Sequence, residues 1–436
     1  MRFTALLLGA SLALGACSER EVLLPGERID VRPQDALPVV ASADGAVGPV
    51  PISLPAQVSR AAWPMRVGDA DNDPGHARLS GAPQPLFATR IGSGDSRRQR
   101  IATDPVSDGR LVFTMDSQSM VTATSAGGGK VWSASLVPSG DKARDAAGGG
   151  LAVVDGTLFA TTGYGRLHAL DAATGARRWT QRLDAPVTAP KAQGGRVYVV
   201  SRDNRAWSLD ADTGRIRWDV SATPATQAMA TAPAPALTGR LAILPFASAE
   251  VVGALADSGL RAWGAAISGE RAGVAYNDVG DITGDPVVAN GTVYAGTAGG
   301  RIVAIDPQSG ERVWTAREGA ISPMAVAGGA VFAVTDRAQL VRMDAATGEV
   351  VWRADLPFFR NDRLRRRKGI YGHHGPVLAG GRLWVASGDG QVRGFDPASG
   401  AVSASLPIAG GAASRPIVVG DVMYVVSRKG LLHAYR

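Results

Sequence analysis

Cysteine is almost absent from the 436-residue chain, in which Cys17 is the single one. No disulfide within a monomer and no zinc site built from cysteine pairs is therefore possible. Aromatic residues make up only 6%, whereas glycine occurs 55 times, a balance that favours short strands and tight turns over long helices. The net charge of +7 is moderate and the basic residues are spread widely, which does not indicate a nucleic-acid-binding protein.

The N-terminus has the features of an export signal. A positive start at Arg2 is followed by an apolar run, residues 3–14, that is too short to span a bilayer. The small pair Gly15-Ala16 directly before Cys17 resembles the lipobox of bacterial lipoproteins. The resemblance implies a signal peptide over residues 1–16 and acylation of Cys17, with palmitate among the chains, and several acyl chains give a stable anchor. Ser18 then implies the outer membrane, and an ordinary secretory signal with an incidental cysteine is the alternative.

Residues 17–84 are predicted to be the lipidated cysteine and an extended tether. No long periodic stretch appears there, and proline recurs at Pro25, Pro33, Pro38, Pro49, Pro51 and Pro55. Because proline fixes φ and removes a backbone donor, such a segment resists regular structure.

From residue 85 an internal repeat takes over, and it decides the fold. The clearest copy spans residues 285–318, where apolar residues alternate and turn residues separate four short runs. The predicted strands are 286–289, 292–297, 301–305 and 312–316, the last carrying Trp314.

Seven copies of the repeat contain all four strands, and an Asp-x-x-Thr/Ser-Gly turn followed by tryptophan is its usual mark. Residues 414–436 supply only three strands of an eighth copy, and residues 85–91 are predicted to supply the fourth, with Phe87 at the tryptophan position. Such a closing strand seals a ring and removes exposed edges. The sequence therefore predicts an all-β fold over residues 85–436, an eight-bladed β-propeller. We expect each tryptophan to pack between adjacent blades and each Asp and Thr to bond turn backbone.

The repeat resembles the quinoprotein (PQQ-type) propeller repeat. Together with the lipobox, the tether and the split last blade, it makes the chain resemble the BamB family, lipoprotein subunits of the outer-membrane β-barrel assembly machinery. The resemblance covers about residues 85–436 and implies a non-catalytic scaffold on the periplasmic side of the outer membrane, without a cofactor. Its implied partners are the POTRA domains of BamA and the other subunits, and its implied role is to aid barrel assembly and insertion. The alternative is a periplasmic PQQ-dependent dehydrogenase-like quinoprotein.

In the BamB family the contact surface lies on loops around the fourth and fifth blades. Asp281 matches one acid of that surface, whereas Thr283 stands where a second acid is expected. A second stretch of the family's contact surface carries an arginine that is absent from this sequence. In the matching stretch here, Met229 can supply an adaptable apolar contact. The resemblance thus predicts partner binding by Met229, Asp278 and Asp281, and loop solvation with turn capping is the alternative for the two acids.

The strongest charge run is residues 360–368, in a long insert between the sixth and seventh blades. Long loops on a rigid scaffold often carry function. Arg365, Arg366 and Arg367 are predicted to contact an acidic partner surface or anionic lipid head groups. A solvated basic loop is the alternative.

The candidate metal sets are incomplete. Asp69-x-Asp71-x-Asp73 begins like a calcium loop, but Pro74 replaces the required glycine and Ser80 the bidentate glutamate. The pair His373-His374 has no third ligand in view. Most aspartates belong to repeat turns, so we predict no metal site, no cofactor and no catalytic residue.

Overall fold

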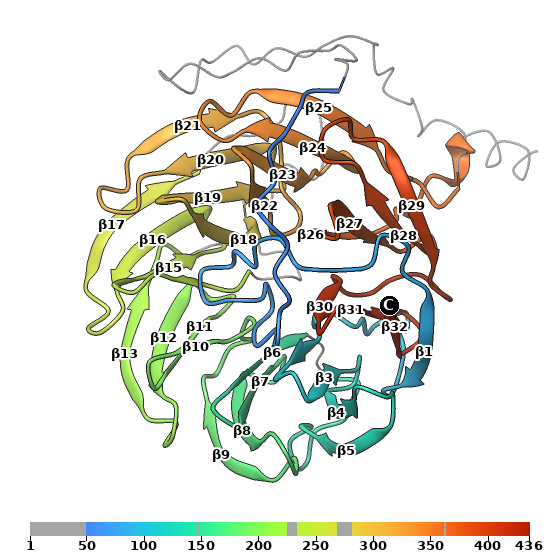
Figure 1. Cartoon of the computed structure of the whole chain (residues 1–436). Coiled ribbons are helices and arrows are strands. Elements are labelled where there is room, and N and C mark those ends of the chain that lie inside the picture. Colours follow the sequence, from blue (N-terminus) through green and yellow to red (C-terminus); the bar gives the residue numbers. More distant parts are fainter. Residues whose placement is uncertain (1–48, 146–147, 225–232, 268–280, 362) are drawn as a thin grey trace, which may run out of the picture. The chain divides into compact units, whose positions relative to one another are not determined.

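A computed structural model describes residues 49–145, 148–224, 233–267, 281–361 and 363–436, all within one compact unit, residues 34–436. In these residues, eight four-stranded antiparallel sheets follow one another around a ring (Figure 1). Seven blades use four consecutive strands, because antiparallel neighbours need only short hairpin turns. The prediction of an eight-bladed β-propeller is confirmed.

The blades are numbered along the chain. Blade 1 consists of β2 (Val106–Ser107), β3 (Leu111–Met115), β4 (Met120–Ser125) and β5 (Lys130–Ser135), and blade 2 of β6 (Gly149–Val154), β7 (Thr157–Thr162), β8 (Arg166–Asp171) and β9 (Arg177–Arg182). Blade 3 consists of β10 (Lys191–Gln193), β11 (Arg196–Val200), β12 (Arg205–Asp210) and β13 (Ile216–Ser221). Blade 4 consists of β14 (Ala236–Leu237), β15 (Leu241–Pro245), β16 (Glu250–Leu255) and β17 (Arg261–Ala266).

Blade 5 consists of β18 (Ile282–Ala289), β19 (Thr292–Thr297), β20 (Arg301–Ile305) and β21 (Arg312–Ala316). Blade 6 consists of β22 (Ala325–Ala327), β23 (Ala330–Val334), β24 (Gln339–Asp344) and β25 (Val350–Asp355). Blade 7 consists of β26 (His373–Ala379), β27 (Arg382–Ser387), β28 (Gln391–Phe395) and β29 (Val402–Pro407). Blade 8 combines β30 (Ile417–Val419), β31 (Val422–Ser427) and β32 (Leu431–Tyr435) with β1 (Pro85–Arg90), and a 3-10 helix, η2 (Leu364–Arg366), lies between blades 6 and 7. In blade 5 three strands have the predicted bounds, and β18 begins at Ile282 rather than at residue 286.

The ring closes in blade 8, as predicted. β1 pairs antiparallel with β32, and the backbone N–H groups of Gln84 and Arg436 each donate to the other residue's carbonyl, at 2.7 and 2.9 Å. Phe87 of β1 lies against Gly128 in the turn of blade 1, so closely that an added Cβ at Gly128 would come within 2.9 Å of the ring.

Tryptophan joins most neighbouring blades, and the predicted role is confirmed. Six tryptophans of fourth strands each donate the indole N–H to a carbonyl in the turn before the fourth strand of the next blade, with N···O distances of 2.7–3.1 Å. The pairs are Trp132–Ala172, Trp179–Ala211, Trp218–Ala256, Trp263–Pro307, Trp314–Ala345 and Trp352–Pro397. Each ring therefore covers the Asp-x-x-Thr/Ser-Gly turn of its neighbour, where that turn is present, and buries apolar area between the sheets.

Ala404 occupies the tryptophan position of blade 7 in β29. The turn that a tryptophan would cover there belongs to blade 8, which lacks it because the fourth strand of blade 8 is β1 and no hairpin turn joins β32 to β1. Instead, the Tyr435 hydroxyl donates to the carbonyl of Pro407 at 2.8 Å. Blade 7 thus has alanine at this position where its neighbour has no turn to cover.

The two faces of the ring differ. One face, here the turn face, carries the hairpin turns that join first to second and third to fourth strands. The opposite face, the connection face, carries the turns between second and third strands and the links from each blade to the next, since every first strand begins where the preceding fourth strand ends.

Residues 50–80, here the crossing segment, run over the middle of the turn face (blue in Figure 1). Their backbone bonds the inner strands of several blades, for example at Ser107, Val153, Leu237, Val288 and Leu378. Trp63 and Val67 are 1% and 0% exposed. This differs from the expectation of a free tether for the described part of residues 17–84. The segment has only isolated β-bridges, as its prolines require, but it is packed because its scattered apolar side chains meet the surface that the ring assembles.

Candidate functional site

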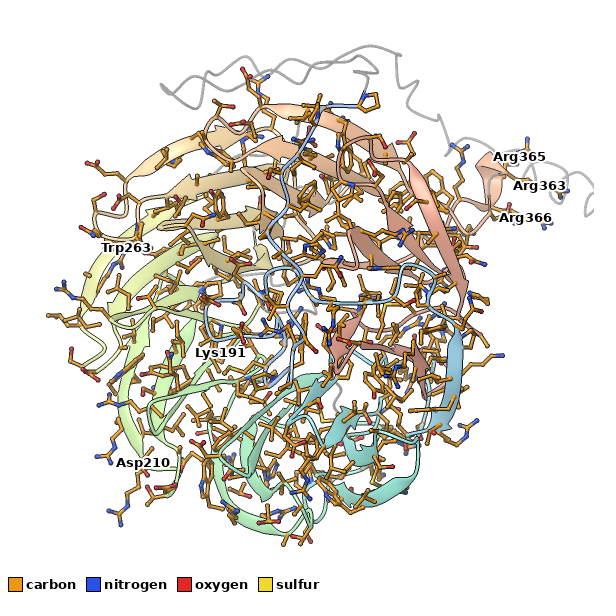
Figure 2. The ribbon with its side chains drawn as sticks, in the orientation of Figure 1. Lys191, Asp210, Trp263, Arg363, Arg365 and Arg366 are labelled. Atoms are coloured by element: carbon orange, nitrogen blue, oxygen red, sulfur yellow. The ribbon has the colours of Figure 1, made fainter. Side chains whose placement is uncertain are left out.

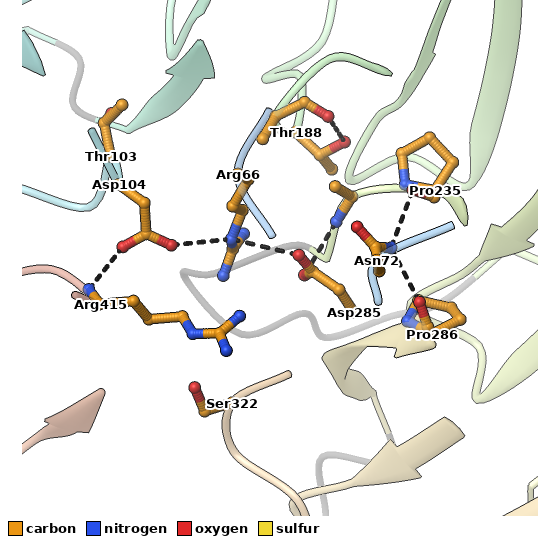
Figure 3. Close-up of polar contacts among 12 residues, drawn as sticks. Arg66, Asn72, Thr103, Asp104, Thr188, Pro235, Asp285, Pro286, Ser322 and Arg415 are labelled. Carbon is orange, nitrogen blue, oxygen red and sulfur yellow. Dashed lines mark hydrogen bonds and ion pairs between the residues drawn. The ribbon is translucent and has the colours of Figure 1, made fainter. Parts of the chain in front are cut away.

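A buried charge cluster lies in the middle of the ring, under the crossing segment. Arg66 projects between two carboxylates, with its Nε 3.3 Å from Oδ2 of Asp104 and 3.3 Å from Oδ2 of Asp285 (Figure 3). Asp104 lies just before β2 of blade 1, and Asp285 lies within β18 of blade 5. Asp104 accepts the backbone N–H of Arg415, and Asp285 accepts that of Ala234. Arg66 therefore ties the crossing segment to opposite parts of the ring.

Further cations surround this cluster. Burial lowers the pKa of Arg415 to about 10, so that it stays charged at neutral pH, and its guanidinium donates to the carbonyl of Pro376 at 2.8 Å. Lys191 is fully buried near the centre (Figure 2) and donates to the Asp69 carbonyl of the crossing segment at 2.7 Å. Burial lowers the pKa of Lys191 to about 7. For Arg66 burial lowers the pKa but the two carboxylates outweigh it, so the ion pairs persist.

Sequence reasoning missed this cluster. A usable signal was present, since Asp104, Asp285 and Arg415 each directly precede a proline near the start of a blade. Such repeated positions line the middle of a propeller, where a charged side chain needs a partner. The partner, Arg66, lies in a segment without a repeat, so its place depends on tertiary contacts.

The predicted partner residues are only partly within the described chain. Cys17, Met229 and Asp278 lie outside the described residues. Asp281 lies directly before β18, at the connection-face end of blade 5, but it is 3% exposed. Burial lowers the pKa of Arg202, and the charge of Asp281 acts in the opposite direction. Thr283 is buried as well, and its hydroxyl donates to the carbonyl of Ala320. Asp281 is thus buried near Arg202 of the β11–β12 turn, and Thr283 bonds the link from blade 5 to blade 6.

Arg365, Arg366 and Arg367 are exposed, in the connection from blade 6 to blade 7. Figure 2 shows Arg365 and Arg366, with Arg363, projecting from the rim of the ring away from the blades. Asp281 instead directly precedes β18 of blade 5, so the described site residues belong to two different parts of the chain.

Side chains of both candidate metal sets make hydrogen bonds within the protein. Nε2–H of His373 donates to the carbonyl of Pro357 at 2.9 Å and Nδ1 accepts from the Ser387 hydroxyl at 2.8 Å, while burial lowers the pKa of His373 to about 4. The carboxylates of Asp71 and Asp73 accept backbone N–H groups of their own turn. Within the described ranges no three His, Cys, Asp or Glu side chains gather as metal ligands do. In the same ranges no helix has the length and apolar character of a membrane span.

The closed ring, the tryptophan-covered turns and the split blade define the class of eight-bladed propellers built from PQQ-type repeats. The family described as outer membrane protein assembly factor BamB matches residues 117–354 and 360–436. The chain belongs to this family.

Relatives agree with this assignment. The outer membrane protein assembly factor BamB of Yersinia pestis is 23% identical over 363 residues, which cover 81% of this chain and 89% of the relative. The dehydrogenase subunit of a quinone alcohol dehydrogenase from Gluconacetobacter polyoxogenes is 34% identical over only 84 residues, 16% of this chain and 11% of the relative.

Two solved structures share the fold. BamB from Moraxella catarrhalis has a TM-score of 0.66 at 18% identity, covering 81% of this chain and 100% of that one. A europium-containing methanol dehydrogenase has a TM-score of 0.64 at 14% identity, covering 84% and 89%. At these identities the likeness concerns the ring alone, so it does not separate a scaffold from an oxidoreductase.

Proposed function

We propose that the chain is a non-catalytic scaffold subunit of the outer-membrane β-barrel assembly machinery, which binds the POTRA domains of BamA and aids barrel assembly and insertion. The observation that carries this proposal is the family match over residues 117–354 and 360–436. The long, nearly end-to-end similarity to an outer membrane protein assembly factor supports it further.

The connection face is the proposed partner surface. The crossing segment already occupies the middle of the turn face and bonds the ends of inner strands there. Met229 and Asp278 belong to links between blades, which start and finish on the connection face. We assign these two residues to direct contact. Asp281, being buried, would instead hold the start of blade 5 in place beside Arg202.

Acylated Cys17 is the proposed anchor, on the periplasmic side of the outer membrane. The lipobox-like Gly15-Ala16-Cys17 supports this assignment. Replacing Cys17 by Ser should release the chain from the membrane fraction or leave its signal peptide uncut, and metabolic labelling with palmitate reads out the modification.

Affinity purification from detergent-solubilised membranes tests the proposed function. BamA should be recovered with the tagged chain. Recovery of a different envelope protein in place of BamA would leave a scaffold but refute its place in this machinery.

A quinoprotein oxidoreductase is the second candidate, because an 84-residue stretch is 34% identical to a quinone alcohol dehydrogenase subunit. Purified chain mixed with the quinone and calcium should then reduce an electron-accepting dye. Under the scaffold proposal neither cofactor absorbance nor dye reduction develops.

A further inference from the structure

The insert between blades 6 and 7 holds most of the net positive charge of the chain. Residues 360–368 contain six arginines and lysines against Asp362, so this stretch carries five of the seven net positive charges. Residues 359–370 are called the basic finger below. A surplus this local creates a strong field on one part of the rim.

The base of the basic finger is fixed to the ring. Phe359 and Ile370 form an antiparallel bridge, and the backbone N–H of Arg360 donates to the carbonyl of Gly369 at 2.9 Å. Next to the bridge, the N–H of Tyr371 donates to the carbonyl of Phe358 at 2.9 Å, and Phe358 packs on the apolar cluster shared by blades 6 and 7. The finger is thus a closed loop on a packed support.

The tip presents its cations to solvent. Arg363, Arg365, Arg366 and Lys368 are exposed, and among the described residues no carboxylate forms a salt bridge with them. The N–H of Arg366 donates to the carbonyl of Arg363 at 2.7 Å, which tightens the 3-10 turn and splays the side chains outward (Figure 2). These four positive charges are therefore available to an external anion.

Aromatic rings hold two further guanidinium groups. Arg367 lies 4.8 Å from the ring centroid of Phe359, and Arg360 lies 6.0 Å from that of Tyr371. Ile370 beside them is 53% exposed. The finger thus combines arginines, which suit phosphate oxygens in paired hydrogen bonds, with apolar area at its base.

We propose that the basic finger binds the phosphate groups of an anionic membrane surface. A convex tip whose cations point in several directions fits mobile head groups, which can rearrange around each guanidinium. A folded acidic partner would need a matching hollow of fixed carboxylates. Each cation close to an anionic membrane adds roughly fivefold to binding. The proposal goes beyond the binding of BamA and does not depend on it.

Vesicle co-sedimentation tests the proposal with the chain from residue 18 onward. This form lacks the acylated cysteine but retains every described strand and the crossing segment. It should sediment with vesicles that mix phosphatidylglycerol with phosphatidylcholine, and less with added salt. The test variant reverses three charges of the finger: Arg365→Glu, Arg366→Glu and Arg367→Glu. We expect its binding to fall at least about 100-fold.

A matched control reverses three exposed arginines elsewhere: Arg97→Glu, Arg98→Glu and Arg110→Glu. It has the same net charge as the test variant and should keep most of the vesicle binding. Equal losses in both variants, or equal binding to pure phosphatidylcholine, would overturn the proposal. So would binding of the finger to polyglutamate without binding to the vesicles. BamA recovery is measured separately with the test variant. If BamA is recovered while vesicle binding does not behave as expected, the membrane proposal fails and the proposed function stands.

Discussion

Arg66 Nε lies 3.3 Å from Asp285 Oδ2, and this contact joins the crossing segment to the first strand of blade 5. Asp285 is 0% exposed, so its charge has no water to stabilise it. The N-terminal segment is therefore part of the folded ring, not an addition to it.

Removal of the Arg66 charge should destabilise the protein strongly. In Arg66→Met, Asp104 and Asp285 stay buried without the cation that lies between them, and breaking such a pair costs about 3–5 kcal/mol. Chemical denaturation measures the loss. Arg78→Met is the control, because Arg78 pairs with Asp421 at the surface and its removal should hardly move the midpoint. Similar midpoints for both variants would contradict a central role for Arg66.

The tryptophan-covered turns predict a difference between two glycines of like conformation. Gly348 has φ +76° and an added Cβ would lie 2.5 Å from the Trp314 ring, whereas Gly291 has φ +75° with open space around it. Gly291→Ala should cost about 1–2 kcal/mol through left-handed backbone strain alone. Gly348→Ala should cost about 1–3 kcal/mol more, because the ring must move. Thermal unfolding compares the two variants, and equal costs would mean that Trp314 does not press on this turn.

Acid should weaken the fold partly through His373. Burial lowers its pKa from 6.5 to about 4. The unfolded chain therefore binds a proton below pH 6.5 that the folded chain refuses, so stability is full above pH 6.5 and falls as the pH drops towards 4. The loss from this one residue is at most about 3 kcal/mol. His373→Gln should flatten the decline of unfolding free energy over this range, and an unchanged slope would exclude His373 as its source.

Closure of blade 8 should keep the ring monomeric. A chain that stops after Gly430 lacks β32 and leaves both β1 and β31 with free edges. Free edges pair with other chains. We expect self-association by size-exclusion chromatography with light scattering, and a stable monomer would show that closure is dispensable.

Much of the ring is predictable because its determinants are local. Alternation of apolar residues and the Asp-x-x-Thr/Ser-Gly turn specify each blade, and the gap in the last copy together with Phe87 specifies the closing strand.

The rest of the molecule depends on surfaces that form only after the ring has closed. Trp63 and Val67 stand alone among prolines and small residues, so no period marks them as buried. The sequence predicts Asp281 to be a surface acid, but it lies directly before β18 and is 3% exposed. Burial of such single residues is a tertiary property that local patterns do not encode.

Site-specific photo-crosslinking in cells tests the central claim, that the connection face binds BamA. Asp203 and Asp212 are exposed aspartates of the same blade, on the β11–β12 turn of the connection face and the β12–β13 turn of the turn face. A crosslinking amino acid at Asp203 should yield an adduct with BamA, and one at Asp212 should not. An adduct from Asp212 alone, or no BamA adduct from either position, would contradict the account.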